Sequence, residues 1–411
     1  MISVDDFRAE ARAWLEANVP LRSGDDNPAA LFTEHPDEAA YVAESRHWQA
    51  RLADSGWAGL TWPEEYGGRG LTPIHQIAWT QEAARFDLPV EVFGIGIGMA
   101  GPTILTWGTE EQKERWLRPM LHGDEIWCQL FSEPNAGSDL ASLQTRAVQD
   151  GDEWVINGQK VWTSGAQWSK WGMLLARTDP SVPKHQGMTY FGIDMEQAGV
   201  EIHSLRQMTG GANFTEVYFD DARVATSGVI GAPGMGWSVG LTTLMNERTS
   251  IGALGGLAGL SGSDALARLM SEVTTRMGIN PATDPATRDR LADIAVRSRV
   301  LEAHAGRIIA KFAKGEIPTA EGSVAKLALS DLLDRVANFG VDSQGAYGML
   351  AGSDALSAGQ WTLAFLGYPG IKLAGGSDEI MRNIIGERVL DLPREPRTDH
   401  DVPFAEVTKN V

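Results

Sequence analysis

A multidomain α+β fold is predicted, in which a β-barrel or β-sandwich domain lies between an N-terminal helical domain and a C-terminal four-helix bundle. Over residues 1–125 and again over 237–392, apolar residues recur every three or four positions, the spacing of amphipathic helices. Between these regions the period changes to two, and clusters of Gly, Pro, Asn or Asp separate short apolar runs. We therefore predict an N-terminal helical domain at 1–125, a middle β domain at 126–232, a C-terminal helical bundle at 233–392 and an extended tail at 393–411.

Two capping boxes mark helix starts in the N-terminal region. Ser3 is followed three residues later by Asp6, and Thr109 by Gln112, a spacing at which the two side chains satisfy free backbone amides of the first helical turn. After Ser3, apolar residues continue at helical spacing until Pro20, which ends the helix. Helices are therefore predicted directly after Ser3 and directly after Thr109.

The middle region carries five apolar runs of strand length, at 126–131, 153–156, 171–176, 188–193 and 214–219. Asn157-Gly158 follows the second run, and this dipeptide favours the left-handed backbone of a type I′ turn. We therefore expect a tight β-hairpin at Asn157-Gly158, which would place Trp162 at a strand end. A stretch rich in Gly and Pro, 231–236, is the predicted hinge back to helix.

The C-terminal region shows one long seam of residues spaced three and four apart. Such a seam specifies packing between helices, and we interpret it as structural. Its members are Leu291, Ile294, Ser298, Leu301, Ala305, Ile308 and Phe312.

Composition excludes several classes of protein. The chain has 411 residues and a formal net charge of −19, which opposes nonspecific binding to nucleic acid or to anionic membranes. No apolar run approaches the roughly 18 residues that span a bilayer, and the N-terminus lacks the features of a signal peptide. Cys128 is the only cysteine, so no internal disulfide can form. We expect a cytoplasmic protein in which Cys128 packs within a strand.

The segment from Gln129 to Asp139 combines the end of an apolar strand with a turn rich in Pro, Asn and Gly. Such a turn exposes backbone donors beside the end of the strand. Together with Trp162-Thr163-Ser164 it predicts a floor for a flat ligand such as a flavin.

Two motifs here identify a family. Phe-Ser-Glu-Pro-Asn-Ala-Gly-Ser-Asp at 131–139, followed by Asn-Gly-Gln-Lys-Val-Trp-Thr-Ser at 157–164, resembles the acyl-CoA dehydrogenase flavoproteins. A further family-like stretch at 375–390 extends the resemblance over nearly the whole chain. The resemblance implies FAD as cofactor, an acyl-CoA substrate and an electron-transfer flavoprotein as electron acceptor. We therefore expect α,β-dehydrogenation of a CoA thioester to the 2,3-enoyl-CoA, a step of lipid β-oxidation.

The resemblance also implies the ligand contacts. Phe131 and Ser132 would meet the pyrimidine edge and N5 region of the flavin, Trp162 would pack on its ring, and Ser164 would contact its polar side. Fixed donors near a flavin tune its electron affinity, and an indole face excludes water. The expected cofactor-binding residues are Gln129, Phe131, Ser132, Trp162, Ser164, Gly376 and Ser377, and the expected substrate-binding residues are Ser138 near the CoA thiol arm, Arg248 and Gly375.

Such a dehydrogenation requires a carboxylate that removes the α-proton next to the thioester. Many family members place this glutamate directly before the Gly-Thr of the C-terminal motif, but here that position is Gly375. Glu247, followed by Arg248, matches the Glu-Arg that serves as base on the first bundle helix in another branch. We therefore expect Glu247 to be the catalytic base, with the Gly375 amide still donating to the thioester carbonyl. Glycines follow it at 252, 255, 256 and 259, where we expect a close approach by ligand or helix.

Two positions depart from the family pattern. Homo-oligomeric members hold the FAD of the neighbouring subunit with an Arg and a Gln, and here Thr274 and Asp342 occupy these positions. Asp repels an anionic pyrophosphate, and Thr cannot replace a bidentate guanidinium. We therefore expect a dimer or tetramer with a related partner chain that supplies the missing groups. The alternative is that Arg276 or Gln344 makes the missing contact to FAD, with the motif shifted along the chain.

Two other functions stay open. A flavin monooxygenase or nitroalkane-type oxidase on the same fold would not need Glu247. A non-catalytic partner subunit should lack both positions of the base and the flavin motif, which this chain keeps. The acyl group is not predicted, because pocket depth depends on helix packing; sterol-derived thioesters are an analogy with heteromeric relatives.

Overall fold

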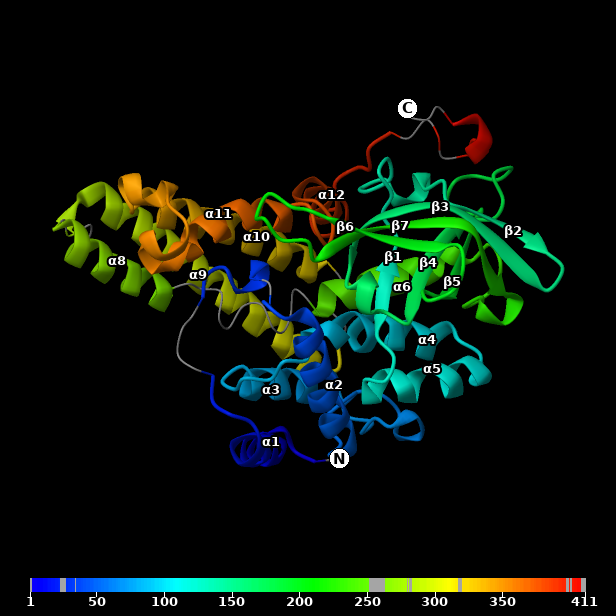
Figure 1. Ribbon diagram of the computed structural model, residues 1–411, viewed down its shortest axis with the longest axis horizontal. Helices are drawn as coiled ribbons and strands as arrows, with labels where there is room; N and C mark the ends of the chain where they lie inside the picture. Colours follow the sequence, from blue (N-terminus) through cyan, green and yellow to red (C-terminus); the bar gives the residue numbers. More distant parts are fainter. Residues whose placement is uncertain are drawn as a thin grey trace. The chain divides into compact units, whose positions relative to one another are not determined.

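Figure 1 shows the computed structural model of the chain, which describes residues 2–22, 27–33, 35–250, 263–278, 280, 283–316, 320–396, 399 and 401–407. Two compact units are present. We call them the β unit, made of His35–Thr72, Pro89–Glu247 and Arg394–Val411, and the bundle unit, made of Met1–Glu34, Pro73–Leu88 and Arg248–Pro393. Each unit is assembled from segments far apart in the sequence.

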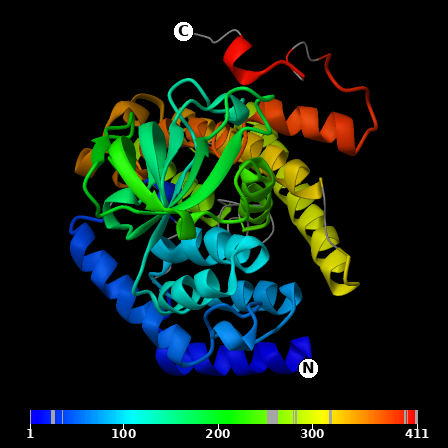
Figure 2. The same cartoon turned by 90° about the vertical axis from the view of Figure 1, so that its right-hand side faces the viewer.

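Within the described residues, a seven-stranded sheet forms the centre of the β unit (Figure 2). Its strands are β1 (Trp127–Leu130), β2 (Arg146–Asp150), β3 (Glu153–Ser164), β4 (Trp171–Arg177), β5 (Met188–Asp194), β6 (Val200–Leu205) and β7 (Phe214–Ala225). The strand order is β1-β4-β2-β3-β7-β6, with β5 paired to β4. β1 and β4 are parallel, whereas β3 and β7 are antiparallel. All five predicted apolar runs lie on strands, and Cys128 is buried in β1 as expected.

The predicted hairpin at Asn157-Gly158 is wrong. β3 runs unbroken through both residues, and the tight turn lies earlier, at Gly151-Asp152 between β2 and β3, where Gly151 has a φ of +63°. Gly158 is required for a different reason. It lies at a β-bulge with a φ of +148°, and a Cβ there would come within 2.6 Å of Thr145 Oγ1.

In the part of the β unit that the structure describes, four longer helices accompany the sheet: α2 (Glu38–Asp54), α4 (Gly101–Trp107), α5 (Glu110–His122) and the part of α6 (Gly236–Ser250) that precedes Arg248. α5 begins with the predicted capping box. The Gln112 amide donates to Thr109 Oγ1 at 3.3 Å, and the Thr109 amide donates to the Gln112 side chain at 3.0 Å. No helix in the described ranges is long and apolar enough to cross a bilayer.

The bundle unit contains α1 (Val4–Asn18), α3 (Pro73–Ala83), α8 (Ser263–Met277), α9 (Pro285–Ala313), α10 (Glu321–Asp342), α11 (Gln360–Ile371) and α12 (Asp378–Arg388). Ser3 caps α1 as predicted. The predicted seam is the buried face of α9, where Ile294, Leu301 and Ile308 join a core shared with α8, α10 and α11. Gly340 of α10 lies directly under the Trp361 ring, so these two helices pack closely.

Candidate functional site

The Phe131-Ser132 segment lies against β3, as a joint flavin floor requires. Phe131 directly follows β1 and is buried, whereas Gln129 and Ser132 are half-buried. The Val161 amide donates to the Ser132 carbonyl at 2.9 Å, so the end of β1 is tied to β3 one residue before Trp162. The structure therefore brings together the two motifs that sequence analysis combined.

A buried ion pair fixes this junction. Lys160 is fully buried, and its Nζ donates to the Phe131 carbonyl at 2.9 Å and to Glu133 Oε1 at 2.8 Å. The amides of Gln144 and Thr145 donate to Glu133 at 2.6 and 2.9 Å. Burial alone would raise the pKa of Glu133, but Lys160 and these amides outweigh it and hold that pKa below its usual value. Burial likewise lowers the pKa of Lys160, against the opposing effect of Glu133.

Sequence analysis missed Lys160 and Glu133 as site residues. A signal was present, because each is a charged residue inside a family motif, and Lys160 directly precedes the apolar pair Val161-Trp162. A lysine at such a position is rarely buried without a partner. Sequence alone does not show which carboxylate is that partner.

Trp162 has an unusual backbone and an exposed ring. Its φ is +61°, at a bulge between Lys160 and Thr163 where β3 has one residue more than β7. A non-glycine residue in this region costs of order 1–3 kcal/mol, and such strain concentrates at ligand sites. The indole is 57% exposed and meets Phe214 edge-to-face. Trp162 thus presents a flat apolar surface beside the end of β1.

The polar groups around this indole suit a planar ring with polar edges. Ser132 and Ser164 are both half-buried, and within the described residues neither hydroxyl has a hydrogen-bond partner. A flavin offers such a ring, with acceptors and a donor along its pyrimidine edge. The residues present therefore fit an isoalloxazine. No group of three or more His, Cys, Asp or Glu in the described ranges could hold a metal ion.

Helix α6 places Glu247 on the face that packs against this region. Phe131 and the Tyr190 ring meet edge-to-face at 5.8 Å, and the Tyr190 hydroxyl lies 2.9 Å from Thr243 Oγ1. A Cβ at Gly240 would lie 3.9 Å from the Phe131 ring. Glu247 follows Gly240 by seven residues and Thr243 by four, so all three share one face of the helix. The half-buried Glu247 is therefore about 6 Å along the helix from the packed Thr243.

The C-terminal motif forms the turn between α11 and α12. Gly375 and Gly376 have φ values of +65° and +94°. The Ser377 hydroxyl is buried and accepts from the Ile380 amide at 3.3 Å as the N-cap of α12. A left-handed backbone disfavours any L side chain, so glycine suits both positions in this chain.

Some predicted residues can be placed only in part. Ser138 is exposed in the loop after β1. Arg248 lies on α6, but its side chain is outside the described part of the structure, as are the glycines at 252, 255, 256 and 259.

The two departures from the family pattern lie on the bundle unit. Asp342 pairs with Arg290 at 2.8 Å, and Thr274 Oγ1 donates to the Met270 carbonyl at 2.7 Å. Gln344 is buried, and its side-chain amide donates to the Gly340 carbonyl at 2.9 Å. Gln344 therefore bonds to the C-terminal end of α10 and is not exposed, whereas Arg276 is exposed beside Glu272.

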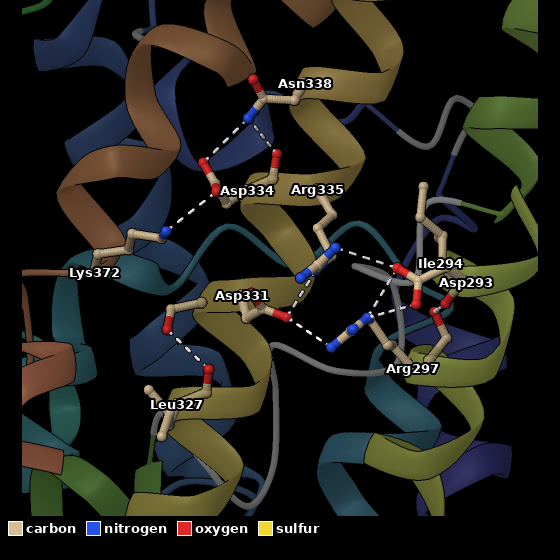
Figure 3. Close-up of polar contacts among 11 residues, drawn as sticks. Asp293, Ile294, Arg297, Leu327, Asp331, Asp334, Arg335, Asn338 and Lys372 are labelled. Carbon is tan, nitrogen blue, oxygen red and sulfur yellow. Dashed lines mark hydrogen bonds and ion pairs between the residues drawn. The ribbon is translucent and has the colours of Figure 1, made fainter. Parts of the chain in front are cut away.

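A hollow of about 820 Å³ on the bundle unit, between α9 and α10, is not a second flavin site. Its lining is charged rather than flat and apolar. As Figure 3 shows, Arg297 and Arg335 each lie between Asp293 and Asp331, at N–O distances of 2.9 to 3.3 Å. These four side chains neutralise one another.

Comparison with known proteins identifies the family. Family models of the N-terminal, middle and C-terminal domains of acyl-CoA dehydrogenases match residues 5–124, 128–222 and 234–390. The chain is 39% identical over 402 residues to acyl-CoA dehydrogenase IpdE1 of Mycobacterium tuberculosis, which covers 97% of this chain and 100% of that protein. It is also 39% identical to acyl-CoA dehydrogenase FadE34 of the same organism, over 93% of this chain and 52% of that protein.

Solved structures give the same result. The Tcur3481-Tcur3483 steroid ACAD has a TM-score of 0.75 and 28% identity, covering 95% of this chain and 98% of that one. The ChsE4-ChsE5 complex from Mycobacterium tuberculosis has a TM-score of 0.76 and 27% identity, covering 96% and 100%. The motifs, the three matched domain models and these relatives lead to one conclusion: the chain belongs to the acyl-CoA dehydrogenase family.

Proposed function

We propose that this acyl-CoA dehydrogenase uses FAD to convert an acyl-CoA thioester to its 2,3-enoyl-CoA, and that Glu247 is the base. One observation carries the proposal. In the β unit, the Val161 to Ser132 backbone hydrogen bond joins the strand that carries the exposed Trp162 to the Phe131-Ser132 segment, and Gly240, Thr243 and Tyr190 pack this segment against the α6 face with Glu247.

Each group has a defined task. Phe131, Ser132, Ser164 and Gln129 hold the polar edge of the ring, and Trp162 covers its face and excludes water. When bound, FAD accepts the β-hydrogen with its electron pair, and an electron-transfer flavoprotein takes the electrons onward.

The substrate contacts complete the proposed mechanism. Glu247 removes the α-proton, which its half-buried position favours because a partly desolvated carboxylate is a stronger base. By the family resemblance, the Gly375 amide donates to the thioester carbonyl, Gly376 and Ser377 meet the flavin, and Ser138 and Arg248 serve the substrate. The amide of Gly375 is sufficient for its task, because stabilising the developing oxyanion needs a donor and no side chain.

Anaerobic titration with a panel of CoA thioesters tests the reaction. We expect the flavin absorbance to bleach with at least one thioester and enoyl-CoA to form in equal amount. A flavin that stays oxidised without oxygen but turns over substrate in air would instead identify a monooxygenase or oxidase. The panel should include steroid-derived thioesters, because one structural neighbour is named a steroid ACAD.

We also propose that a related partner chain completes the FAD site. Asp342 and Thr274 replace the family's Gln and Arg, and Gln344 is buried with its side-chain amide bonded to the Gly340 carbonyl, which leaves the exposed Arg276 as the alternative donor. The ChsE4-ChsE5 complex offers a precedent for two different chains in one assembly. Flavin per chain decides the question. Protein produced without a partner chain should bind markedly less than one FAD per chain. A homo-oligomer with one FAD per chain would exclude the need for a partner.

A further inference from the structure

Residues 401–407 belong to the β unit and lie against the loop between β4 and β5 (red in Figures 1 and 2). The Phe404 amide donates to the Val182 carbonyl at 2.9 Å, and the Ala405 amide donates to the Pro180 carbonyl at 2.9 Å. Phe404 is only 4% exposed. This segment is therefore docked by its backbone and by a buried aromatic ring.

Phe404 covers a buried arginine of β4. The guanidinium carbon of Arg177 lies 3.8 Å from the centre of the Phe404 ring, a cation–π contact. Arg177 donates to the Ala141 carbonyl at 2.6 Å, and to the Lys184 carbonyl at 2.6 Å. Burial lowers the pKa of Arg177 to about 10, although Glu133 and Asp139 oppose the shift. The guanidinium thus connects the docked segment to the chain just after Asp139.

A second cation makes a parallel connection. Lys184 is buried, and its Nζ lies 2.7 Å from Asp399 and 2.9 Å from Asp139. Lys184 also lowers the pKa of Asp399, as expected for a carboxylate that is charged in the pair. Asp139 of the loop after β1 and Asp399 of the C-terminal segment therefore both pair with the ammonium group of Lys184.

We infer that Asp399 and residues 401–407 form a positioning segment for the loop 138–143, and that this loop serves the CoA part of the thioester. The inference rests on the proposed function, which places Ser138 near the CoA thiol arm. Arg177 and Lys184 each bond the loop on one side and the C-terminal segment on the other. Removing the segment would expose both cations to water, which competes for the loop contacts.

The two connections should differ in strength. Without Phe404, the Arg177 guanidinium loses its cover and its bond to the Ala141 carbonyl becomes accessible to water. Without the charge of Asp399, Lys184 still keeps Asp139 as a partner. Phe404→Ala should therefore loosen the loop more than Asp399→Asn, and the exposed Glu406 of the same segment provides a matched control.

Hydrogen exchange on the full chain with FAD bound and no substrate present tests the inference. We expect amides in 140–145 to exchange about tenfold faster in Phe404→Ala, less so in Asp399→Asn, and at the wild-type rate in Glu406→Gln. In steady-state assays, the KM for a CoA thioester should rise about fivefold in Phe404→Ala with little change in kcat.

The outcomes separate this inference from the proposed function. Faster exchange at 404–405 with unchanged exchange at 140–145 would overturn the positioning role, and so would a fall in kcat without a change in KM. If Phe404→Ala does not fold, Asp399→Asn against Glu406→Gln gives the same comparison. If no variant oxidises any thioester but the exchange results hold, the proposed function has failed and the mechanical link between segment and loop stands.

Discussion

Two clusters of opposite charges in this protein have similar geometry and different surroundings. In the β unit, Lys160 and Glu133 lie 2.8 Å apart with side chains 0% and 8% exposed. On the bundle unit, the pair between Arg335 and Asp331 has a distance of 2.9 Å, but its side chains are 43% and 40% exposed. Exposed ion pairs are screened by water and contribute about 0–1 kcal/mol. Breaking a buried pair costs about 3–5 kcal/mol, because it leaves one charge desolvated.

The comparison indicates at which of the two clusters a charged residue can be replaced with little loss of stability. The buried pair holds the Phe131 carbonyl and two amides of the following loop, so its loss would move the backbone of the proposed flavin floor. The exposed network joins α9 to α10 at the surface, where solvent can replace any member.

The largest effect is expected from Lys160→Met. It leaves Glu133 buried without a cation and should lower the free energy of unfolding by about 3–5 kcal/mol. Denaturant unfolding of the holoprotein measures this. Lys170→Met is the control in the same unit, because Lys170 is partly exposed beside Asp194 and should change stability by about 1 kcal/mol or less. Equal losses in the two variants would show that burial does not separate them.

The pH dependence of stability provides a second test of the buried pair. The folded-state pKa of Glu133 lies below the ordinary value of 4.5, so its charged form contributes stability above that value, and this stability is lost as the pH falls through the folded-state pKa. The stability difference between wild type and Glu133→Gln should therefore be large at pH 7 and shrink below about pH 4.5. Unfolding free energies measured from pH 7 downward test this, and a constant difference would contradict it.

Trp162→Gly should separate ligand binding from stability. Glycine relieves the left-handed backbone, which costs a non-glycine residue of order 1–3 kcal/mol, so the apoprotein should be no less stable. The lost stacking surface should weaken FAD binding by about tenfold. Isothermal titration and apoprotein unfolding measure the two effects. Unchanged FAD affinity would exclude Trp162 from the flavin site.

The smallest effect is expected from Arg335→Gln on the bundle unit. Its ion pairs are exposed, so the free energy of unfolding should fall by about 1 kcal/mol or less, and by less still in high salt. A loss as large as that of Lys160→Met would mean that this network is not simply a solvated surface.

Sequence predicted the elements whose signals are local. The helix cap at Ser3, the capping box at Thr109 and the α9 seam are confirmed, because each is encoded by residues three or four positions apart, although in the described structure Asp6 makes no reciprocal bond to the Ser3 amide. β2 and β6 were missed because most of their residues are exposed or half-buried and form no apolar run. The hairpin at Asn157-Gly158 was misplaced because Gly158 is needed for close packing against Thr145 and not for a turn. This packing is a tertiary contact, which the local sequence does not show.

For the candidate site, the sequence predicted the motifs but not the details of their backbone conformation and contacts. The Val161 to Ser132 hydrogen bond places the Phe131-Ser132 segment beside the strand that carries Trp162, and the contacts of these residues with a flavin stay a prediction. The structure adds what no motif shows: the strained φ of Trp162 and the buried partnership of Lys160 with Glu133. Both depend on strand register, which a single sequence does not specify at a bulge.

The central claim is that Glu247 removes the α-proton, and Glu247→Gln tests it most directly. Glutamine keeps the size of the side chain and removes its basicity. Stopped-flow mixing with a CoA thioester that bleaches the wild-type flavin should show reduction slowed by about 10²–10⁴-fold, with FAD content and thioester binding unchanged. Flavin reduction at the wild-type rate in this variant would contradict the account.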